Sequence, residues 1–238
     1  MTYLEQVHKP WGQMFYDLAY MQLNIPNTPR LRILDFGSGV GLCANHYAKW
    51  HDVTAIEPSA DMIACSFTDN KYEQIHGGID ELCRYKNEFD LVICHNVLEY
   101  IREKEEIIAA LTAAAKPGGQ LSIIKHNIYG RVIAAAVFDE DPKKAMNLFN
   151  DINTDQSRTF GERLLYENHE LLSWADKHFL LAKAHYGIRA MYALGQNNEI
   201  KFDPNWYEHM LALESMVGDV DEFRRIAFLN HFVFEKVM

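Results

Sequence analysis

Hydrophobic and polar positions alternate along the first half of the chain in a pattern that predicts strands separated by helices. The expected strands are short apolar or β-branched runs at 31–36, 53–57, 72–76, 89–94 and 120–125. The expected helices between them cover 42–50, 59–67 and 97–115. The last of these places Val97, Ile101, Ile108, Leu111 and Ala115 near one helical face. This alternation is typical of a parallel sheet built from β-α-β units.

The second half of the chain has a looser pattern. We expect helices at 129–138, 142–149, 168–177 and 204–217, and strands at 180–194 and 227–236. The polar stretch 151–163 is expected to belong to an insertion. The pattern therefore predicts one domain over 1–238, with a helical segment at 1–30, a core at 31–126, and helical cap insertions at 127–165 and 195–226.

The run from Ile33 to Gly41, a buried strand entering a glycine-rich turn, is the strongest candidate for a ligand site. Glycines at alternate positions allow a sharp bend and close approach of a ligand, while the helix start offers free N–H groups. A dinucleotide loop would need a glycine where Leu42 stands. Asp35 is unfavourable beside a pyrophosphate but favourable beside an ammonium group. The loop therefore predicts a ligand that is cationic at this end.

Glu57 ends the second expected strand, sixteen residues after Gly41. A carboxylate at this position can accept hydrogen bonds from both hydroxyls of a ribose. A ribose with a cationic, phosphate-free extension describes S-adenosylmethionine better than NAD. The alternative is that Asp35 caps the turn and that Glu57 is a solvated acid at a helix start. The joint spacing of the two acids favours the ligand.

The chain resembles the class I S-adenosylmethionine-dependent methyltransferases over residues 30–126. Three later motifs carry the resemblance in order: Phe89-Asp90-Leu91-Val92, His95-Asn96-Val97-Leu98-Glu99-Tyr100 and Lys116-Pro117-Gly118-Gly119. The resemblance implies a Rossmann-like α/β fold, with a seven-stranded, mostly parallel sheet, helices on both faces and an α-helical cap. It also implies S-adenosylmethionine as the cofactor.

The resemblance implies a set of cofactor-binding residues at the ends of the first four strands. They are Asp35, Phe36, Gly37, Ser38, Gly39, Gly41, Glu57, Pro58, Met62, Gly78, Ile79, Asp80, His95, Asn96 and Val97. Such enzymes often have an acid that bonds the adenine amino group at the position where this chain has Gly78. Asp80 or Glu81 could take over this role.

A finer resemblance extends past the core, to the bacterial enzymes that methylate the carboxylate of 5-carboxymethoxyuridine in tRNA. It is carried by the stretches at 122–130, 211–214 and 228–232. It implies a carboxylate acceptor on tRNA. A small-molecule methyltransferase and a non-catalytic cofactor-binding module stay open as alternatives. Where that family tends to supply an arginine for the cofactor carboxylate, this chain offers Lys9, Trp11 and Gln13.

The chemistry of the acceptor decides whether a general base is needed. A carboxylate is already ionised at pH 7, whereas an alcohol or amine needs a proton acceptor. His95, at the end of the fourth expected strand, is the best-placed histidine, but a cofactor contact or a packing role explains it equally well. The sequence therefore assigns no catalytic residue.

Charge gives a mixed indication about a nucleic-acid partner. The 238 residues carry 23 Lys and Arg against 33 Asp and Glu, so the net charge of −10 argues against nonspecific coating of nucleic acid. Six basic residues could still form a local positive rim for tRNA: Lys125, Arg131, Lys143, Lys144, Arg158 and Arg163. Interleaved acids favour the alternative that these are ordinary solvated charges.

The remaining patterns predict what the protein lacks. Cys43, Cys65, Cys83 and Cys94 form no Cys-x-x-Cys pair and are expected to be reduced. No metal-binding motif is found, and no apolar run approaches the ~20 residues of a membrane span. Charges at Glu5 and Lys9 argue against a secretory peptide, so we expect a cytoplasmic protein without a metal or a membrane partner.

Overall fold

The computed structural model describes residues 3–150, 154–157 and 161–237. The chain forms two compact units, which are described separately. Unit 1 comprises Met1–Asn24, Lys125–Glu167 and His185–His231. Unit 2 comprises Ile25–Ile124, Asn168–Ala184 and Phe232–Met238.

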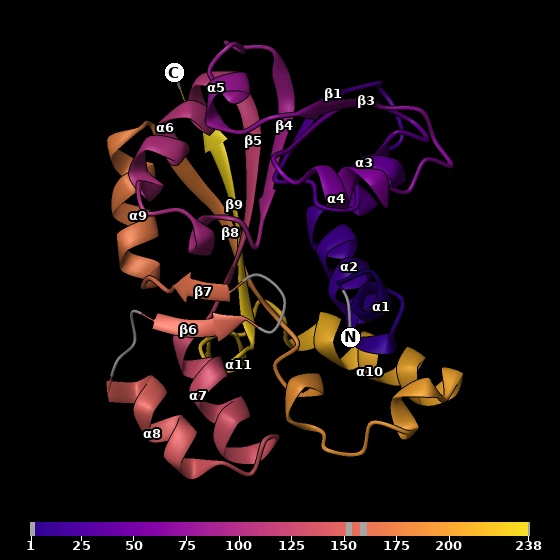
Figure 1. The fold of residues 1–238 in the computed structure, drawn as a ribbon, viewed down its shortest axis with the longest axis vertical. Coiled ribbons are helices and arrows are strands. Elements are labelled where there is room, and N and C mark those ends of the chain that lie inside the picture. Colours follow the sequence, from indigo (N-terminus) through magenta and orange to yellow (C-terminus); the bar gives the residue numbers. More distant parts are fainter. Residues whose placement is uncertain (1–2, 151–153, 158–160, 238) are drawn as a thin grey trace. The chain divides into compact units, whose positions relative to one another are not determined.

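A seven-stranded sheet has the strand order β3-β2-β1-β4-β5-β9-β8 (Figure 1). Its strands are β1 Arg32–Phe36, β2 Asp52–Glu57, β3 Glu73–His76, β4 Phe89–His95, β5 Ala115–His126, β8 Leu180–Ile188 and β9 Leu229–Lys236. The five strands β1 to β5 pair in parallel. β1, β2 and β4 are almost continuously buried, as expected of parallel strands covered on both faces. The predicted Rossmann-like α/β class with a seven-stranded sheet is confirmed.

Short helices connect the strands of unit 2. They are α3 Leu42–Tyr47, α4 Ala60–Ala64, α5 Ile79–Leu82, the 3-10 turn η1 Leu98–Tyr100, α6 Lys104–Ala114 and α9 Asn168–Lys177. Ser59 begins α4 as its N-cap, because its hydroxyl accepts a hydrogen bond from the Met62 N–H at 3.3 Å. α9 lies beside α6. The strands lie in the core of the unit, where Ile33, Leu34, Ile56 and Ile93 are fully buried.

The prediction of one continuous helix over 97–115 is wrong. The segment forms η1 and then α6, because Ile101 between them has an extended backbone (φ −118°, ψ 136°). The Lys104 ammonium donates to the Ile101 carbonyl at 2.8 Å, which satisfies a backbone acceptor at this break.

The predicted stop at Lys116-Pro117-Gly118-Gly119 is confirmed, since α6 ends at Ala114. The four residues do not form a separate loop before the next strand. They bulge out of β5, which pairs Ala115 with Phe89 and then resumes at Gln120 opposite Leu91. Gly118 permits the bulge because its φ of +76° lies in the left-handed region.

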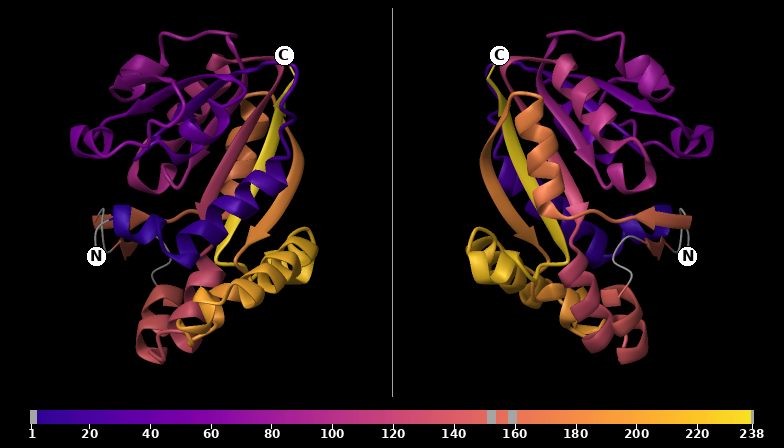
Figure 2. Two further views of the ribbon diagram at one scale, coloured as in Figure 1. Left: turned by 90° about the vertical axis from the view of Figure 1, so that its right-hand side faces the viewer. Right: turned by 90° about the vertical axis from the view of Figure 1, so that its left-hand side faces the viewer.

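Unit 1 is built mainly from helices. They are α1 Tyr3–Val7, α2 Pro10–Leu23, α7 Ile128–Val137, α8 Pro142–Asn150, the 3-10 turns η2 Tyr192–Leu194 and η3 Ile200–Phe202, α10 Pro204–Val217 and α11 Asp221–Arg224. α7 and α8 lie side by side (Figure 2) around Ala135, Ala145 and Leu148. The Tyr207 hydroxyl of α10 donates to the Asp17 carboxylate of α2 at 2.8 Å. These contacts hold segments from distant parts of the chain together.

Two predictions for the second half need correction. The expected strand 180–194 ends at Ile188, because Arg189 adopts a left-handed backbone (φ +61°) and a turn follows. The stretch expected as a polar insertion contains an antiparallel pair, β6 Thr154–Ser157 with β7 Gly161–Leu164. The sequence did not predict these two strands, because the stretch is polar and lacks the alternation of apolar and polar residues that indicates a strand.

Gly130 of α7 supplies a test of the packing in unit 1. A Cβ at this position would overlap the Ala227 carbonyl group, whose carbon would lie 2.6 Å away. We expect Gly130→Ala to lower the free energy of unfolding by about 1–3 kcal/mol, measured by urea denaturation. Gly195→Ala is the matched control, because a Cβ there meets ordinary contacts at 3.8 Å. Equal stability of the two variants would contradict the close approach of α7 to Ala227.

Candidate functional site

The glycine loop joins the end of β1 to the start of α3. Gly37, Gly39 and Gly41 have φ values of +71°, +58° and +72°, a backbone conformation that side chains disfavour. A Cβ on Gly37 would collide with the Val97 side chain, and a Cβ on Gly41 would collide with the Tyr72 hydroxyl. The loop therefore requires glycine for its backbone conformation and for close packing.

Asp35 belongs to β1, two residues before Gly37, and 4% of its surface is exposed. Its carboxylate accepts a hydrogen bond from the Ala44 N–H of α3 at 3.1 Å. Burial raises the pKa of Asp35 to about 7; the bond from Ala44 opposes this rise, and the nearby charge of Glu57 adds to it. A cation beside Asp35 would favour its ionised form.

Glu57, at the end of β2, is 7% exposed and therefore not the solvated acid of the alternative interpretation. One carboxylate oxygen accepts from the Gly39 N–H at 2.8 Å, and the other accepts from the Ser59 N–H at 2.9 Å. Each oxygen keeps a further lone pair for a ligand hydroxyl. Glu57 thus holds the glycine loop and the start of α4 at the same time.

The end of β4 adds polar groups at the same edge of the sheet, since the carboxyl ends of parallel strands lie together. His95 Nε2 is 2.7 Å from the Ser122 hydroxyl, and Nδ1 is 3.9 Å from the Cys43 sulfur. Asn96 has a left-handed backbone (φ +55°). Among the described residues, the buried Oδ1 of Asn96 and the buried hydroxyl of Ser38 have no hydrogen-bond partner. Such orphaned atoms mark a place where a polar ligand fits.

The other predicted site residues belong to the same loops of unit 2. Phe36 is buried, Pro58 is exposed, and Met62 and Ile79 are partly buried on α4 and α5. Gly78 precedes α5, and Asp80 in its first turn is exposed. The amino-terminal candidates Lys9, Trp11 and Gln13 belong to unit 1 instead.

Unit 1 brings three residues of the predicted positive rim, Lys125, Arg131 and Arg163, together with Arg189, which the sequence analysis did not single out. We call Lys125, Arg131, Arg163 and Arg189 the basic cluster. Lys125 is 1% exposed and Arg163 is 7% exposed, so the interpretation of these two as solvated charges is wrong. The Lys125 ammonium lies over the Tyr166 ring, and the Arg163 guanidinium donates to His126 Nε2. These partners are about forty residues away in sequence, so the local pattern could not show the burial.

The other members of the predicted positive rim behave differently. Lys143 is exposed, and the Lys144 ammonium pairs with the Asp139 carboxylate at 2.6 Å. Arg158 lies outside the described residues.

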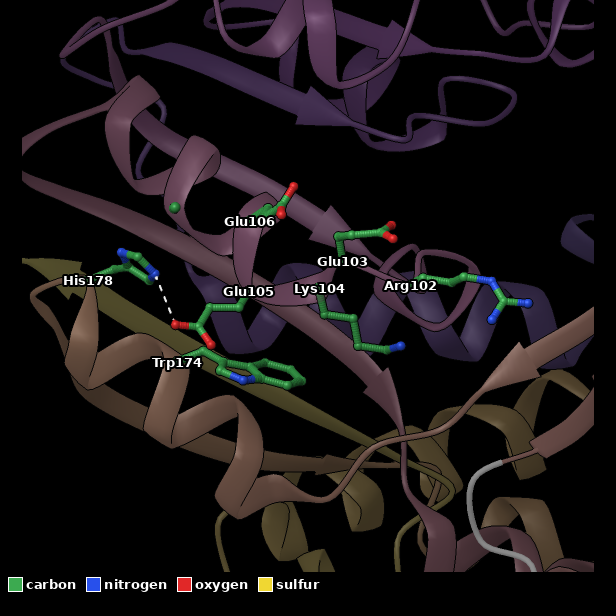
Figure 3. Close-up of a pocket in the computed structure, with 8 residues that line it drawn as sticks. Arg102, Glu103, Lys104, Glu105, Glu106, Trp174 and His178 are labelled. Atoms are coloured by element: carbon green, nitrogen blue, oxygen red, sulfur yellow. Dashed lines mark ion pairs between the residues drawn. The ribbon is translucent and has the colours of Figure 1, made fainter.

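A surface pocket lies between α6 and α9 in unit 2 (Figure 3). It is lined by Arg102, Glu103, Lys104, Glu105, Glu106, Ala109, Trp174 and His178. Glu105 pairs with His178 at 3.7 Å and with Lys177 at 3.0 Å. The pocket contains none of the predicted site residues, so we assign the candidate site to the glycine loop.

The described part of the chain contains neither a candidate metal site nor a candidate membrane span. No group of three or more His, Cys, Asp or Glu side chains there could hold a metal ion. No helix within the same residues is long and apolar enough to cross a membrane.

Comparison with known proteins gives matches to methyltransferases. A family profile described as a methyltransferase domain matches residues 34–123. The tRNA 5-carboxymethoxyuridine methyltransferase of Escherichia coli K12 is 31% identical over 111 residues, which cover 42% of each chain. The ubiquinone biosynthesis O-methyltransferase of Coxiella burnetii is 30% identical over 123 residues, 47% of this chain and 53% of that one. The chain thus matches about half the length of these relatives.

A solved structure is similar over nearly the whole chain. Phosphoethanolamine N-methyltransferase 2 of Haemonchus contortus, in complex with S-adenosyl-L-methionine, has a TM-score of 0.59 and 17% identity. The match covers 96% of this chain and 56% of that one. At this identity the similarity establishes the fold.

Proposed function

Because residues 34–123 form a class I S-adenosylmethionine-dependent methyltransferase domain, we propose that this chain methylates a carboxylate on a modified wobble uridine of tRNA. The glycine loop with its two buried acids carries the proposal of methyl transfer. The similarity to the Escherichia coli enzyme supports the tRNA acceptor.

The residues at the ends of β1, β2 and β4 suit S-adenosylmethionine. Asp35 would hold the ammonium of the amino-acid tail, and Glu57 would accept from the ribose hydroxyls. The unpartnered Ser38 hydroxyl and Asn96 amide oxygen would gain hydrogen bonds. Gly78, Ile79 and Asp80, which open α5, would lie along the adenine.

Bound S-adenosylmethionine supplies an electrophilic methyl group on a sulfonium. Transfer to a carboxylate breaks one S–C bond, forms one O–C bond and needs no proton transfer. The task of this chain is then to hold the acceptor in line, and such positioning contributes up to ~7 to 11 kcal/mol.

The histidines at the ends of β4 and β5 are poorly suited to act as bases, which supports a carboxylate acceptor. His95 already has partners at both ring nitrogens. The Arg163 guanidinium donates to His126 Nε2 at 2.9 Å. Burial, followed by the charges of Arg163 and Arg131, holds the pKa of His126 well below its usual range.

The pKa of Asp35 gives a prediction about cofactor affinity. Since the carboxyl is protonated below pH 7 and a cation favours its ionised form, binding should release a proton in that range. We expect the affinity for S-adenosylmethionine to fall about tenfold for each pH unit below about 6, measured by calorimetry. Asp35→Asn should bind more weakly at neutral pH and lose this pH dependence. A wild-type affinity for S-adenosylmethionine that does not change between pH 5 and pH 7 would contradict the contact assigned to Asp35.

Glu57 gives a second prediction about the cofactor. We expect Glu57→Ala to weaken binding of S-adenosylmethionine by about 1.5–3 kcal/mol, the usual contribution of hydrogen bonds to a charged group. Glu88→Ala is the control, because Glu88 makes a surface ion pair with Arg32 in the same unit. If the two variants bound S-adenosylmethionine equally well, Glu57 would only stabilise the glycine loop and would not contact the cofactor.

The acceptor is tested with methyl-labelled S-adenosylmethionine incubated with total tRNA or with a metabolite extract. We expect the label in tRNA, within one nucleoside after digestion. Mild alkali should release it as methanol, because a methyl ester hydrolyses whereas a methyl ether or methylamine does not. Glu57→Ala should transfer less label than the wild type at a cofactor concentration that does not saturate the variant.

Two results would contradict the proposed acceptor. Label found only in the metabolite extract would indicate a small-molecule methyltransferase, as the similarity to the Coxiella burnetii enzyme would suggest. Binding of S-adenosylmethionine without transfer to either pool would indicate a non-catalytic binding module.

A further inference from the structure

The basic cluster lies where three neighbouring strands of the sheet begin or end. Lys125 and His126 are the last residues of β5, Arg189 directly follows β8, and Phe228 directly precedes β9. Because β5, β9 and β8 are adjacent in the sheet, residues far apart in sequence meet here. The cluster is therefore a consequence of the fold.

Aromatic rings organise the cations of the cluster. The guanidinium groups of Arg131 and Arg189 each lie 5.0 Å from the centroid of the Phe228 ring. The Lys125 ammonium lies 4.6 Å from the centroid of the Tyr166 ring. Such contacts offset part of the cost of burying a cation.

Arg189 has two features that point to a ligand. Its φ of +61° is rare for a residue with a side chain, and such strain is concentrated at functional sites. Its buried Nε has no hydrogen-bond partner among the described residues, and neither has the hydroxyl of Tyr192, which is 1% exposed. The Tyr192 ring lies 5.5 Å from the Arg189 guanidinium.

The turn after Arg189 is fixed by Glu214 of α10. This buried carboxylate accepts hydrogen bonds from the N–H groups of Ala190, Met191 and Tyr192 at 2.8, 2.8 and 2.7 Å. A side chain of α10 thus holds the backbone that presents Arg189.

The electrostatics of this region favour an anion. Burial and the neighbouring Arg189 lower the pKa of Lys201 to about 8. His126 is surrounded by the four cations of the basic cluster. Glu214 is an acid near Arg189, but its oxygens are used by the three backbone N–H groups. A bound anion would lower the free-energy cost of keeping these cations out of water.

Resting on the proposed function, we propose that the basic cluster binds the carboxylate of the methyl acceptor, with Arg189 as its principal contact. The planar guanidinium matches a carboxylate through two parallel hydrogen bonds, and the Tyr192 hydroxyl supplies a further donor. The other cations compensate the buried negative charge.

The test compares the wild type with Arg189→Gly, which removes the side chain but suits the left-handed backbone. The midpoint of thermal unfolding is measured in sodium acetate, sodium phosphate and sodium chloride at equal ionic strength. We expect acetate to raise the midpoint of the wild type above its value in chloride, because an anion bound to the folded state stabilises it. Arg189→Gly should remain folded and lose this rise.

Arg225→Gln is the matched control, since Arg225 is an exposed arginine of unit 1 paired with Asp221. It should keep the response to acetate. Three results would overturn the proposal: no difference between acetate and chloride in the wild type, a full acetate response in Arg189→Gly, or a larger rise in phosphate than in acetate. The last would assign the cluster to a phosphate group instead.

Kinetics separate this proposal from the proposed function. With tRNA as the acceptor, Arg189→Gly should raise KM for tRNA roughly ten- to hundredfold and leave the affinity for S-adenosylmethionine within about twofold of the wild type. An acetate response that depends on Arg189 without labelling of tRNA would contradict the tRNA acceptor and support the anion site. Labelling of tRNA with an unchanged KM in Arg189→Gly would support the proposed function and overturn the role of Arg189.

Discussion

The candidate site depends on the hydrogen bonds that the Glu57 carboxylate accepts from the Gly39 and Ser59 N–H groups. They join the turn after β1 to the turn after β2, so the two strand ends keep a fixed spacing. Burial strengthens these charge-assisted bonds, because water cannot compete for the carboxylate. In the proposed function Glu57 also accepts from the ribose hydroxyls, and this second role would use the remaining lone pairs of the same oxygens.

Asp35 contributes the complementary constraint. Burial raises the pKa of Asp35, and the nearby negative charge of Glu57 adds to this rise. A cationic ligand reverses this penalty, whereas a pyrophosphate would increase it. The choice between a sulfonium nucleoside and a dinucleotide therefore follows from the charge of the site as well as from the spacing of its glycines.

Local sequence predicted the parts of this protein that depend on local chemistry. The glycine positions, Asp35 and Glu57 could be identified because a turn, a strand end and a buried acid leave a short-range pattern. The sequence could not predict the burial of Lys125 and Arg163, or the approach of Arg131 and Arg189 to the same Phe228 ring, because these features depend on residues distant in sequence. Lys125 looks like a surface residue until Tyr166, about forty positions later in the sequence, covers it.

Arg189 illustrates why such a residue is hard to predict and informative once seen. A glycine at this position would relieve the left-handed backbone, and a hydrophobic side chain would avoid the burial of a charge. The chain instead has an arginine, next to a turn whose three N–H groups donate to the Glu214 carboxylate. Stability alone favours neither the conformation nor the charge, and an anionic ligand accounts for both.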